Sequence, residues 1–151
     1  MGPLVNPAHP THQLTGTYSL ELARQYQHTL RNERKEFTVL HGMDGFDELT
    51  FIGVTRILGQ QRDVLLGNNP LQTAISLPQI SGGETVEEAA TLLANLLSGK
   101  GTEPQNIVLA GNVGLALQTF HPEMDFETAF AKGYEAVKTG TAIHHLKKIA
   151  S

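Results

Sequence analysis

The sequence predicts an α/β fold in which short strands come early and helices follow. Two observations support this prediction. Runs of β-branched residues and leucine lie within residues 36–66, whereas helix-forming runs with capping residues dominate residues 85–149. The length of 151 residues suffices for one domain with a sizeable core. Because no internal repeat or long linker divides the chain, we expect a single domain over residues 1–151.

In the first half, prolines fix φ near the N-terminus and predict irregular chain there. Ser19 can cap a helix that runs to about Arg31, and residues 36–40 predict a short strand that ends at His41-Gly42. The remaining predictions for this half are two strands over residues 49–58 and 62–66, a turn at Gly59-Gln60-Gln61 between them, and a surface connection over residues 67–83.

The second half is predicted to be helical. A capping box starts at Thr85, and the helix behind it stops near Gly99. Residues 103–120 are apolar nearly all round, which is typical of a buried helix. The remaining predictions are a third helix capped by Asp125, a core stripe of Phe126, Phe130 and Tyr134 along it, an interruption at Gly140, and a last helix over residues 141–149.

Composition excludes several classes of function. The net charge is -4 and no run of Lys and Arg occurs, which argues against a nucleic-acid-binding protein. There is no cysteine, so disulfides, zinc-thiolate sites and thiol nucleophiles are excluded. No apolar stretch approaches the roughly 20 residues that cross a bilayer. We therefore expect a cytoplasmic protein without nucleic-acid or membrane partners.

An acidic loop is the most informative segment for chemistry. It follows the predicted strand and contains Asp44, Asp47 and Glu48 within five positions. Open α/β sheets bind ligands at the carboxyl ends of their strands, and Mg²⁺ prefers one or two carboxylates together with water and phosphate oxygens. Asp47 and Glu48 are therefore candidate metal ligands. The alternative is a solvated acidic turn in which an aspartate caps the next element.

The histidines are weaker candidates. His9 and His12 lie in a proline-rich loop, and the neighbours His144 and His145 do not face the same way on a helix, so we expect no metal site at either pair. His41 borders the acidic loop, where a structural role is favoured over proton transfer. Glu87-Glu88 are interpreted as capping residues.

Four segments, taken in order, resemble the anthranilate phosphoribosyltransferase family. Residues 2–8 spell Gly-Pro-Leu-Val-Asn-Pro-Ala, and residues 41–48 spell His-Gly-Met-Asp-Gly-Phe-Asp-Glu. Asn112 within its apolar segment and residues 139–146 continue the similarity. The resemblance implies a phosphoribosyltransferase/nucleoside-phosphorylase-like α/β domain. It also implies an enzyme that joins anthranilate to phosphoribosyl pyrophosphate (PRPP) in tryptophan biosynthesis, with release of pyrophosphate.

The resemblance also implies a site. Asp47 and Glu48 match the acidic pair that binds Mg²⁺ beside the pyrophosphate of the donor, and Pro3 matches a proline of the anthranilate channel. Asn6 and Gly42 are the other substrate-binding candidates. No catalytic residue is assigned, because the implied mechanism depends on positioning rather than on a protein nucleophile.

The family's glycine-rich donor loop and helical dimerising region precede the segment that matches residues 2–8. The sequence is therefore expected to be the C-terminal part of such an enzyme, a truncated domain that is inactive alone and homodimeric when complete. It departs from the family at residues 67–79 and at Val113-Gly114. Two alternatives stay open: a non-catalytic ligand-binding or interaction module of the same fold, and a related nucleoside phosphorylase.

Overall fold

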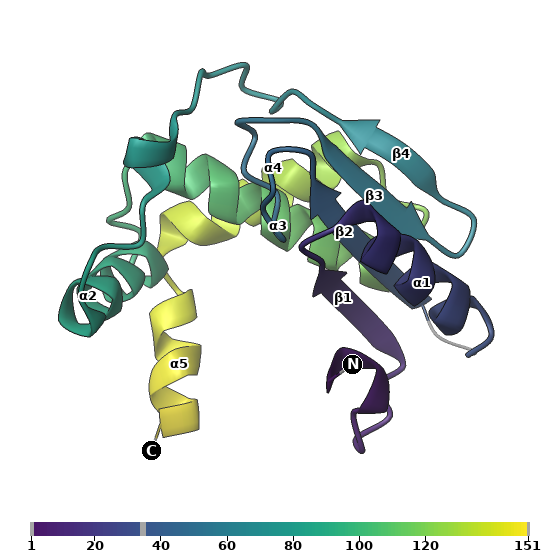
Figure 1. Cartoon of the computed structure of the whole chain (residues 1–151). Coiled ribbons are helices and arrows are strands. Elements are labelled where there is room, and N and C mark those ends of the chain that lie inside the picture. The colour runs from purple at the N-terminus through teal and green to yellow at the C-terminus, as the bar shows by residue number, and fades with distance from the viewer. Residues whose placement is uncertain (1, 34–35, 151) are drawn as a thin grey trace.

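The structure is a computed structural model that describes residues 2–33 and 36–150. A mixed sheet lies at its centre, with helices on both faces (Figure 1). The strands of the described part are β1 (His12–Gly16), β2 (Glu36–Gly42), β3 (Thr55–Gly59) and β4 (Asp63–Leu66). Its helices are η1 (Gly2–Val5, 3-10), α1 (Leu20–Arg31), η2 (Leu77–Ile80, 3-10), α2 (Val86–Leu97), α3 (Glu103–Phe120), α4 (Phe126–Thr139) and α5 (Ala142–Ala150).

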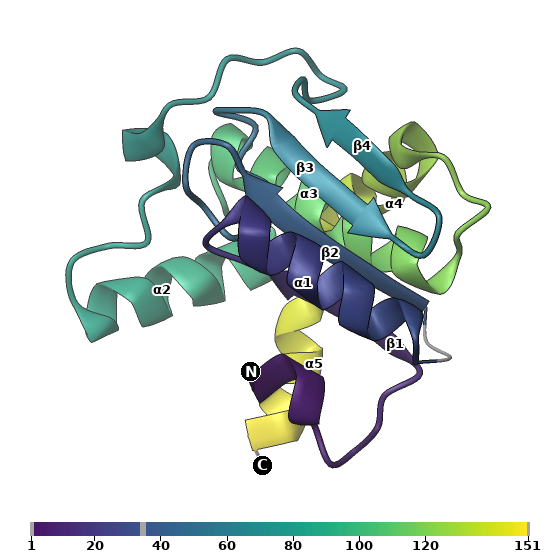
Figure 2. The same ribbon diagram turned by 45° about the vertical axis from the view of Figure 1, so that its right-hand side comes forward.

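The sheet has the order β1-β2-β3-β4. β1 and β2 are parallel, whereas β2–β3 and β3–β4 are antiparallel. Helix α1 forms the crossover between the parallel strands and covers one face of the sheet, and α3 with α4 lies on the other face (Figures 1 and 2). Because β1 and β2 run the same way, their carboxyl ends meet at one edge of the sheet.

Two apolar clusters form the core, one on each face of the sheet. Alternate residues of β2 supply them: Phe37 and Val39 pack under α1, whereas Leu40 packs against α3 and α4. This arrangement follows from the two-residue period of a strand. A strand that is covered on both faces is apolar along its length, and residues 37–42 are all buried.

Most sequence predictions for the helices are confirmed. Ser19 caps α1, with its hydroxyl accepting a hydrogen bond from the Leu22 amide at 3.2 Å. Asp125 caps α4 by accepting a hydrogen bond from the Thr128 amide at 2.8 Å. The helix predicted over residues 103–120 has those bounds, and Gly140, with φ 66°, separates α4 from α5.

The capping box at the start of α2 differs in one contact. The Thr85 hydroxyl accepts from the Glu88 amide, as expected, but the Glu88 carboxylate accepts from the Glu84 amide, one residue before the cap.

Two predictions about the first half are wrong, and one strand was not predicted. The strand expected over residues 49–58 begins only at Thr55, because the Asn112 side chain occupies both backbone groups of Leu49 and Phe51 adopts a φ of 58°. Residues 2–5 form the short helix η1 instead of irregular chain. Strand β1 has no sequence signal, since Leu14 is its one large apolar residue; it exists because it pairs with β2.

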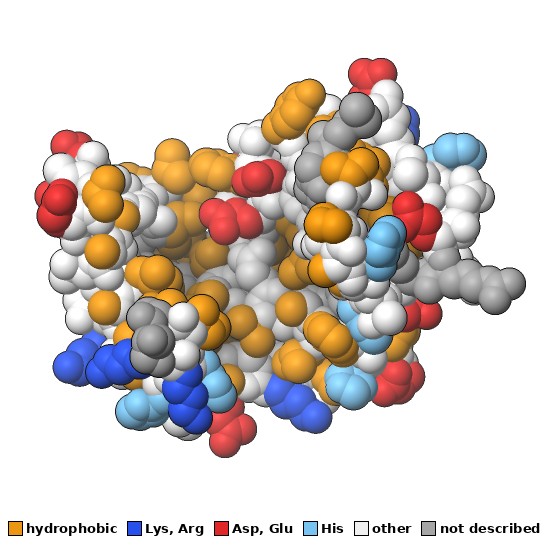
Figure 3. All heavy atoms as spheres, turned by 90° about the horizontal axis from the view of Figure 1, so that it is seen from below, with side chains coloured by type: hydrophobic (Ala, Val, Ile, Leu, Met, Phe, Trp, Pro, Cys, Tyr) orange, Lys and Arg blue, Asp and Glu red, His pale blue; other side chains and the backbone are white. Residues whose placement is uncertain are grey.

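Helix α3 is buried on one side only, so the prediction of a buried helix holds for half of its surface. Phe120, the last residue of α3, is 59% exposed. Every residue of α2 is at least partly exposed, and Leu93 in this helix is 50% exposed. Figure 3 shows hydrophobic side chains gathered around a hollow on the face that carries α5 and the N-terminal helix. Within the described residues, no helix combines the length and the apolar character needed to span a bilayer.

Candidate functional site

The carboxyl ends of β1 and β2 are joined by a short network of hydrogen bonds. The Thr17 amide donates to the Leu40 carbonyl at 2.9 Å, and His41 Nδ1 lies 2.9 Å from the Thr17 carbonyl oxygen. A carbonyl only accepts, so Nδ1 carries the proton in this contact. Because His41 is buried and engaged here, the contact supports the structural role expected for it.

The acidic loop (residues 43–54) leaves β2 at this edge. Its first turn is closed by the Gly42 amide, which donates to the Phe46 carbonyl at 2.8 Å. The Asp44 carboxylate accepts a hydrogen bond from the Thr50 hydroxyl at 2.8 Å, so this carboxylate holds the loop together. A Cβ atom on Gly42 would lie 2.3 Å from Asp44 Oδ1, which explains why glycine fits here. Asp44 is therefore engaged within the loop.

Asp47 and Glu48, by contrast, are exposed, and neither carboxylate has a hydrogen bond or ion pair within the described part of the chain. Partial burial raises the pKa of Glu48, and the neighbouring charge of Asp47 raises it further. Two adjacent like charges without a cation partner form an arrangement that a divalent cation would stabilise.

Two contacts place this pair, and the sequence did not predict either of them. A Cβ atom on Gly16 would lie 1.6 Å from the Asp47 carbonyl oxygen, so the last residue of β1 packs directly against the backbone of the acidic loop. From α3, the Asn112 side chain accepts from the Leu49 amide at 3.1 Å and donates to the Leu49 carbonyl at 2.8 Å. The residues on both sides of Glu48 are thus held in place.

The other candidate residues are placed as follows. Gly42 is the last residue of β2 and borders the acidic loop. Asn6 is exposed, and its Oδ1 accepts from the Ala8 amide at 2.9 Å. No hydrogen bond or ion pair joins Asn6 to the acidic loop in the part of the chain described. Pro3 lies in η1, but its side chain is outside the described residues.

The acidic pair faces an open surface. A cavity of about 430 Å³ includes Phe51 and Ile52 of the same loop but not Asp47 or Glu48; its other lining residues are Gly67, Asn68, Asn69, Gln72, Thr73 and Ala74. Across residues 2–33 and 36–150, no group of three or more His, Asp or Glu side chains could hold a metal ion. A cation at Asp47 and Glu48 would therefore complete its coordination with water and ligand oxygens, as Mg²⁺ usually does.

The comparison with known families identifies the chain. The family model described as "Glycosyl transferase family, a/b domain" matches residues 1–143. The chain belongs to this family. The family resemblance inferred from the motifs and the predicted α/β class are thereby confirmed.

Curated relatives agree with that assignment. The anthranilate phosphoribosyltransferases of Christiangramia forsetii and Flavobacterium psychrophilum are each 37% identical to this chain, over 150 and 153 residues respectively. Each alignment covers 99% of this chain and 45% of the relative, so the chain spans less than half the length of these enzymes. The C-terminal placement within such an enzyme stays a prediction from the motifs.

Solved structures show the same fold. Anthranilate phosphoribosyltransferase from Saccharomyces cerevisiae in complex with PRPP and Mg has a TM-score of 0.82, with 23% identity, and the match covers 97% of this chain and 42% of that one. The Thermus thermophilus enzyme has a TM-score of 0.77 at 24% identity, covering 88% and 40% respectively.

Proposed function

We propose that this chain is part of an anthranilate phosphoribosyltransferase, which transfers the phosphoribosyl group from PRPP to anthranilate with Mg²⁺. The observation that carries the proposal is the exposed, unpartnered pair Asp47 and Glu48 at the carboxyl edge of the parallel strands β1 and β2. The names of the relatives favour this activity over the nucleoside phosphorylase and the non-catalytic module.

Asp47 and Glu48 would hold Mg²⁺ in this site. Two neighbouring carboxylates fit the ion, which takes one or two of them and completes its octahedron with water and phosphate oxygens. The bound ion would offset the negative charge of the departing pyrophosphate. The protein contributes position: Gly16 and Asn112 hold the backbone of Asp47 and Leu49, so the backbone that carries the two carboxylates does not have to be ordered when the donor arrives.

Substrate contacts are proposed for three further positions: Pro3, Asn6 and Gly42. Gly42 is the best supported of them, because it is the last residue of β2 and directly adjoins the acidic loop. No residue of this chain is proposed as a nucleophile or a general base. A cytoplasmic location and a homodimeric complete enzyme remain parts of the proposal, and the cysteine-free composition agrees with the location.

Binding of Mn²⁺, a paramagnetic substitute for Mg²⁺, tests the metal site. In a ¹H–¹⁵N NMR spectrum of the 151-residue chain, Mn²⁺ with PRPP should broaden the amide signals of residues 43–48 and 16–18 first. The double variant Asp47→Asn/Glu48→Gln should weaken Mn²⁺ binding at least about tenfold, which corresponds to about 1.4 kcal/mol.

The matched control is Glu87→Gln/Glu88→Gln, which removes another adjacent acidic pair from the exposed helix α2. Its broadening should equal that of the unmodified chain. Broadening centred on α2 or on the histidines, or unchanged binding in the Asp47/Glu48 variant, would contradict the proposed site.

A further inference from the structure

A second cavity lies at the end of the sheet opposite the acidic loop. It has a volume of about 610 Å³, within the range of small-molecule sites. The start of β2, the β3–β4 turn and the C-terminal end of α3 enclose it. Its lining includes Glu36, Arg62, Val64, Gln118 and Pro122.

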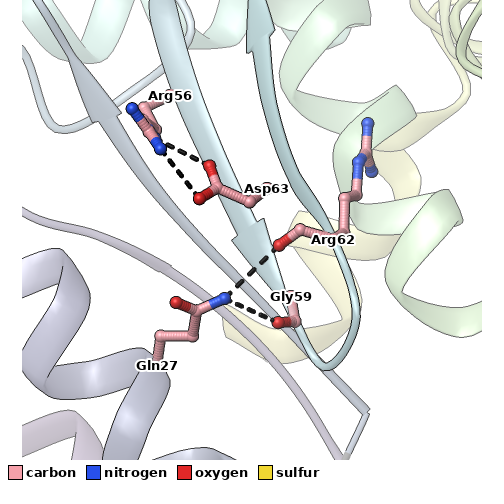
Figure 4. A network of polar contacts seen from close by, with 5 residues as sticks. All are labelled: Gln27, Arg56, Gly59, Arg62 and Asp63. Carbon is pink, nitrogen blue, oxygen red and sulfur yellow. Dashed lines mark hydrogen bonds and ion pairs between the residues drawn. The ribbon is translucent and has the colours of Figure 1, made fainter.

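Arg62 is held in a defined position in this cavity. Its Nη1 donates to Gln118 Oε1 at 2.9 Å, and Gln118 in turn donates from Nε2 to the Met124 carbonyl at 2.8 Å. On the other face of the sheet, the Gln27 side chain donates to the carbonyls of Gly59 and Arg62 at 2.9 and 3.3 Å. Figure 4 shows the Arg62 side chain extending away from Gln27.

The guanidinium of Arg62 has no carboxylate partner within the described residues, although it is partly buried. Burial lowers the pKa of Arg62, yet an arginine stays charged at neutral pH. The neighbouring Arg56 shows the contrasting arrangement, since its Nε and Nη2 contact the Asp63 carboxylate at 2.7 and 2.8 Å. A partly buried cation with most of its donors unused is suited to an anionic ligand.

We propose that this cavity binds a small organic acid, whose carboxylate is held by Arg62. A guanidinium presents paired N–H donors that match the two oxygens of a carboxylate. Two features select this class. Glu36 lines the same cavity and would repel a doubly charged phosphate more than a singly charged carboxylate, and Val64 and Pro122 offer an apolar wall for the body of the ligand. Asp63 also lines the cavity, but its charge is engaged by Arg56.

The test is a titration followed by NMR, with ¹⁵N-labelled chain, acetate as the probe and constant ionic strength. Acetate should move the Arg62 Nε–H signal and the amide signals of residues 118 and 119 along a saturable curve. Phosphate at neutral pH should bind more weakly than acetate. Because the Arg62 signal is observed in the unmodified chain, this experiment does not depend on the stability of a variant.

Substitutions distinguish a specific contact between Arg62 and acetate from a general effect of positive charge. Arg62→Gln should weaken acetate binding at least tenfold, and Arg62→Lys should weaken it several-fold because the ammonium cannot form the paired contact. Lys132→Gln removes an equal charge from the exposed surface of α4, away from the residues that line the cavity, and should leave acetate binding unchanged. A flat Arg62 Nε–H response, equal binding by folded Arg62→Gln, or tighter binding of phosphate would overturn the proposal. The outcome is independent of the acidic loop and of the transferase assignment.

Discussion

The amide side chain of Asn112, on α3, binds both backbone groups of Leu49, the residue that directly follows the acidic pair. It accepts from the Leu49 amide at 3.1 Å and donates to the Leu49 carbonyl at 2.8 Å, and it also donates to the Val108 carbonyl at 2.9 Å. A helix on one side of the sheet therefore fixes a loop at its edge. This contact explains why asparagine stands in an otherwise apolar helix.

The first prediction concerns this contact. Asn112→Ala leaves the partly buried backbone groups of Leu49 without partners, and the free energy of unfolding should fall by about 1–3 kcal/mol. Urea unfolding followed by circular dichroism measures the loss. The matched control is Asn95→Ala on the exposed surface of α2, which should change stability by less than about 0.5 kcal/mol. Equal effects of the two substitutions would show that the contact does not hold the loop.

Gly16 provides the second prediction. In Gly16→Ala the new methyl group would lie 1.6 Å from the Asp47 carbonyl oxygen, so the acidic loop must move. Overpacking of this kind should cost about 1–3 kcal/mol of stability, and Mn²⁺ binding at Asp47 and Glu48 should weaken. Gly82→Ala is the control, because a Cβ atom there meets no atom within 4 Å. Unchanged Mn²⁺ binding in Gly16→Ala would show that metal binding does not depend on the position of the acidic loop.

The third prediction follows from the raised pKa of Glu48. A carboxyl group whose pKa is higher in the folded than in the unfolded state favours folding when it is protonated, and that contribution is lost as pH rises through the folded pKa. Its ordinary value is 4.5. Glu48→Gln should therefore raise the urea midpoint at neutral pH, and the gain should vanish at about pH 3.5, where the carboxyl is protonated in both states.

Asp47→Asn is the companion variant, since it removes the neighbouring charge that contributes to the shift. It should lower the pKa of Glu48, which ¹³C carboxyl NMR can follow directly. Because burial is the larger cause, part of the shift should remain. A Glu48 titration that is unaffected by Asp47→Asn would indicate that the two carboxylates lie too far apart to share a cation.

The fourth prediction concerns the attachment of α1 to the β3–β4 hairpin. Gln27 is buried and donates to the Gly59 and Arg62 carbonyls across the turn. Gln27→Ala should lower the free energy of unfolding by about 1–3 kcal/mol, because the buried contact from Gln27 to the Gly59 carbonyl is lost. The Arg62 carbonyl keeps the Gly59 amide as a donor at 2.8 Å. Gln25→Ala, on the exposed side of the same helix, should have little effect. Similar losses in both variants would mean that helix propensity, and not the contact, is responsible.

Local signals predicted much of the fold. The caps at Ser19 and Asp125 and the bounds of α3 follow from interactions within a few residues, which the sequence encodes directly. Strand β1 was not predicted, because its five residues show no apolar alternation. These residues form a strand because they pair with β2. The strand predicted over residues 49–58 is absent over its first six residues for the opposite reason, since a distant side chain, Asn112, takes the Leu49 backbone groups that a sheet would use.

The candidate site shows the same division. Residue type and order along the chain were enough to predict the α/β class, the family and the acidic residues that could bind a cation. The packed fold was needed to show that Asp44 is bound within its loop while Asp47 and Glu48 remain open. It was also needed to show that Gly16 and Asn112 hold the backbone beside Glu48 at the carboxyl edge of the sheet. The contacts of Gly16 and Asn112 join residues tens of positions apart, and such contacts form only when the sheet and its helices have packed together.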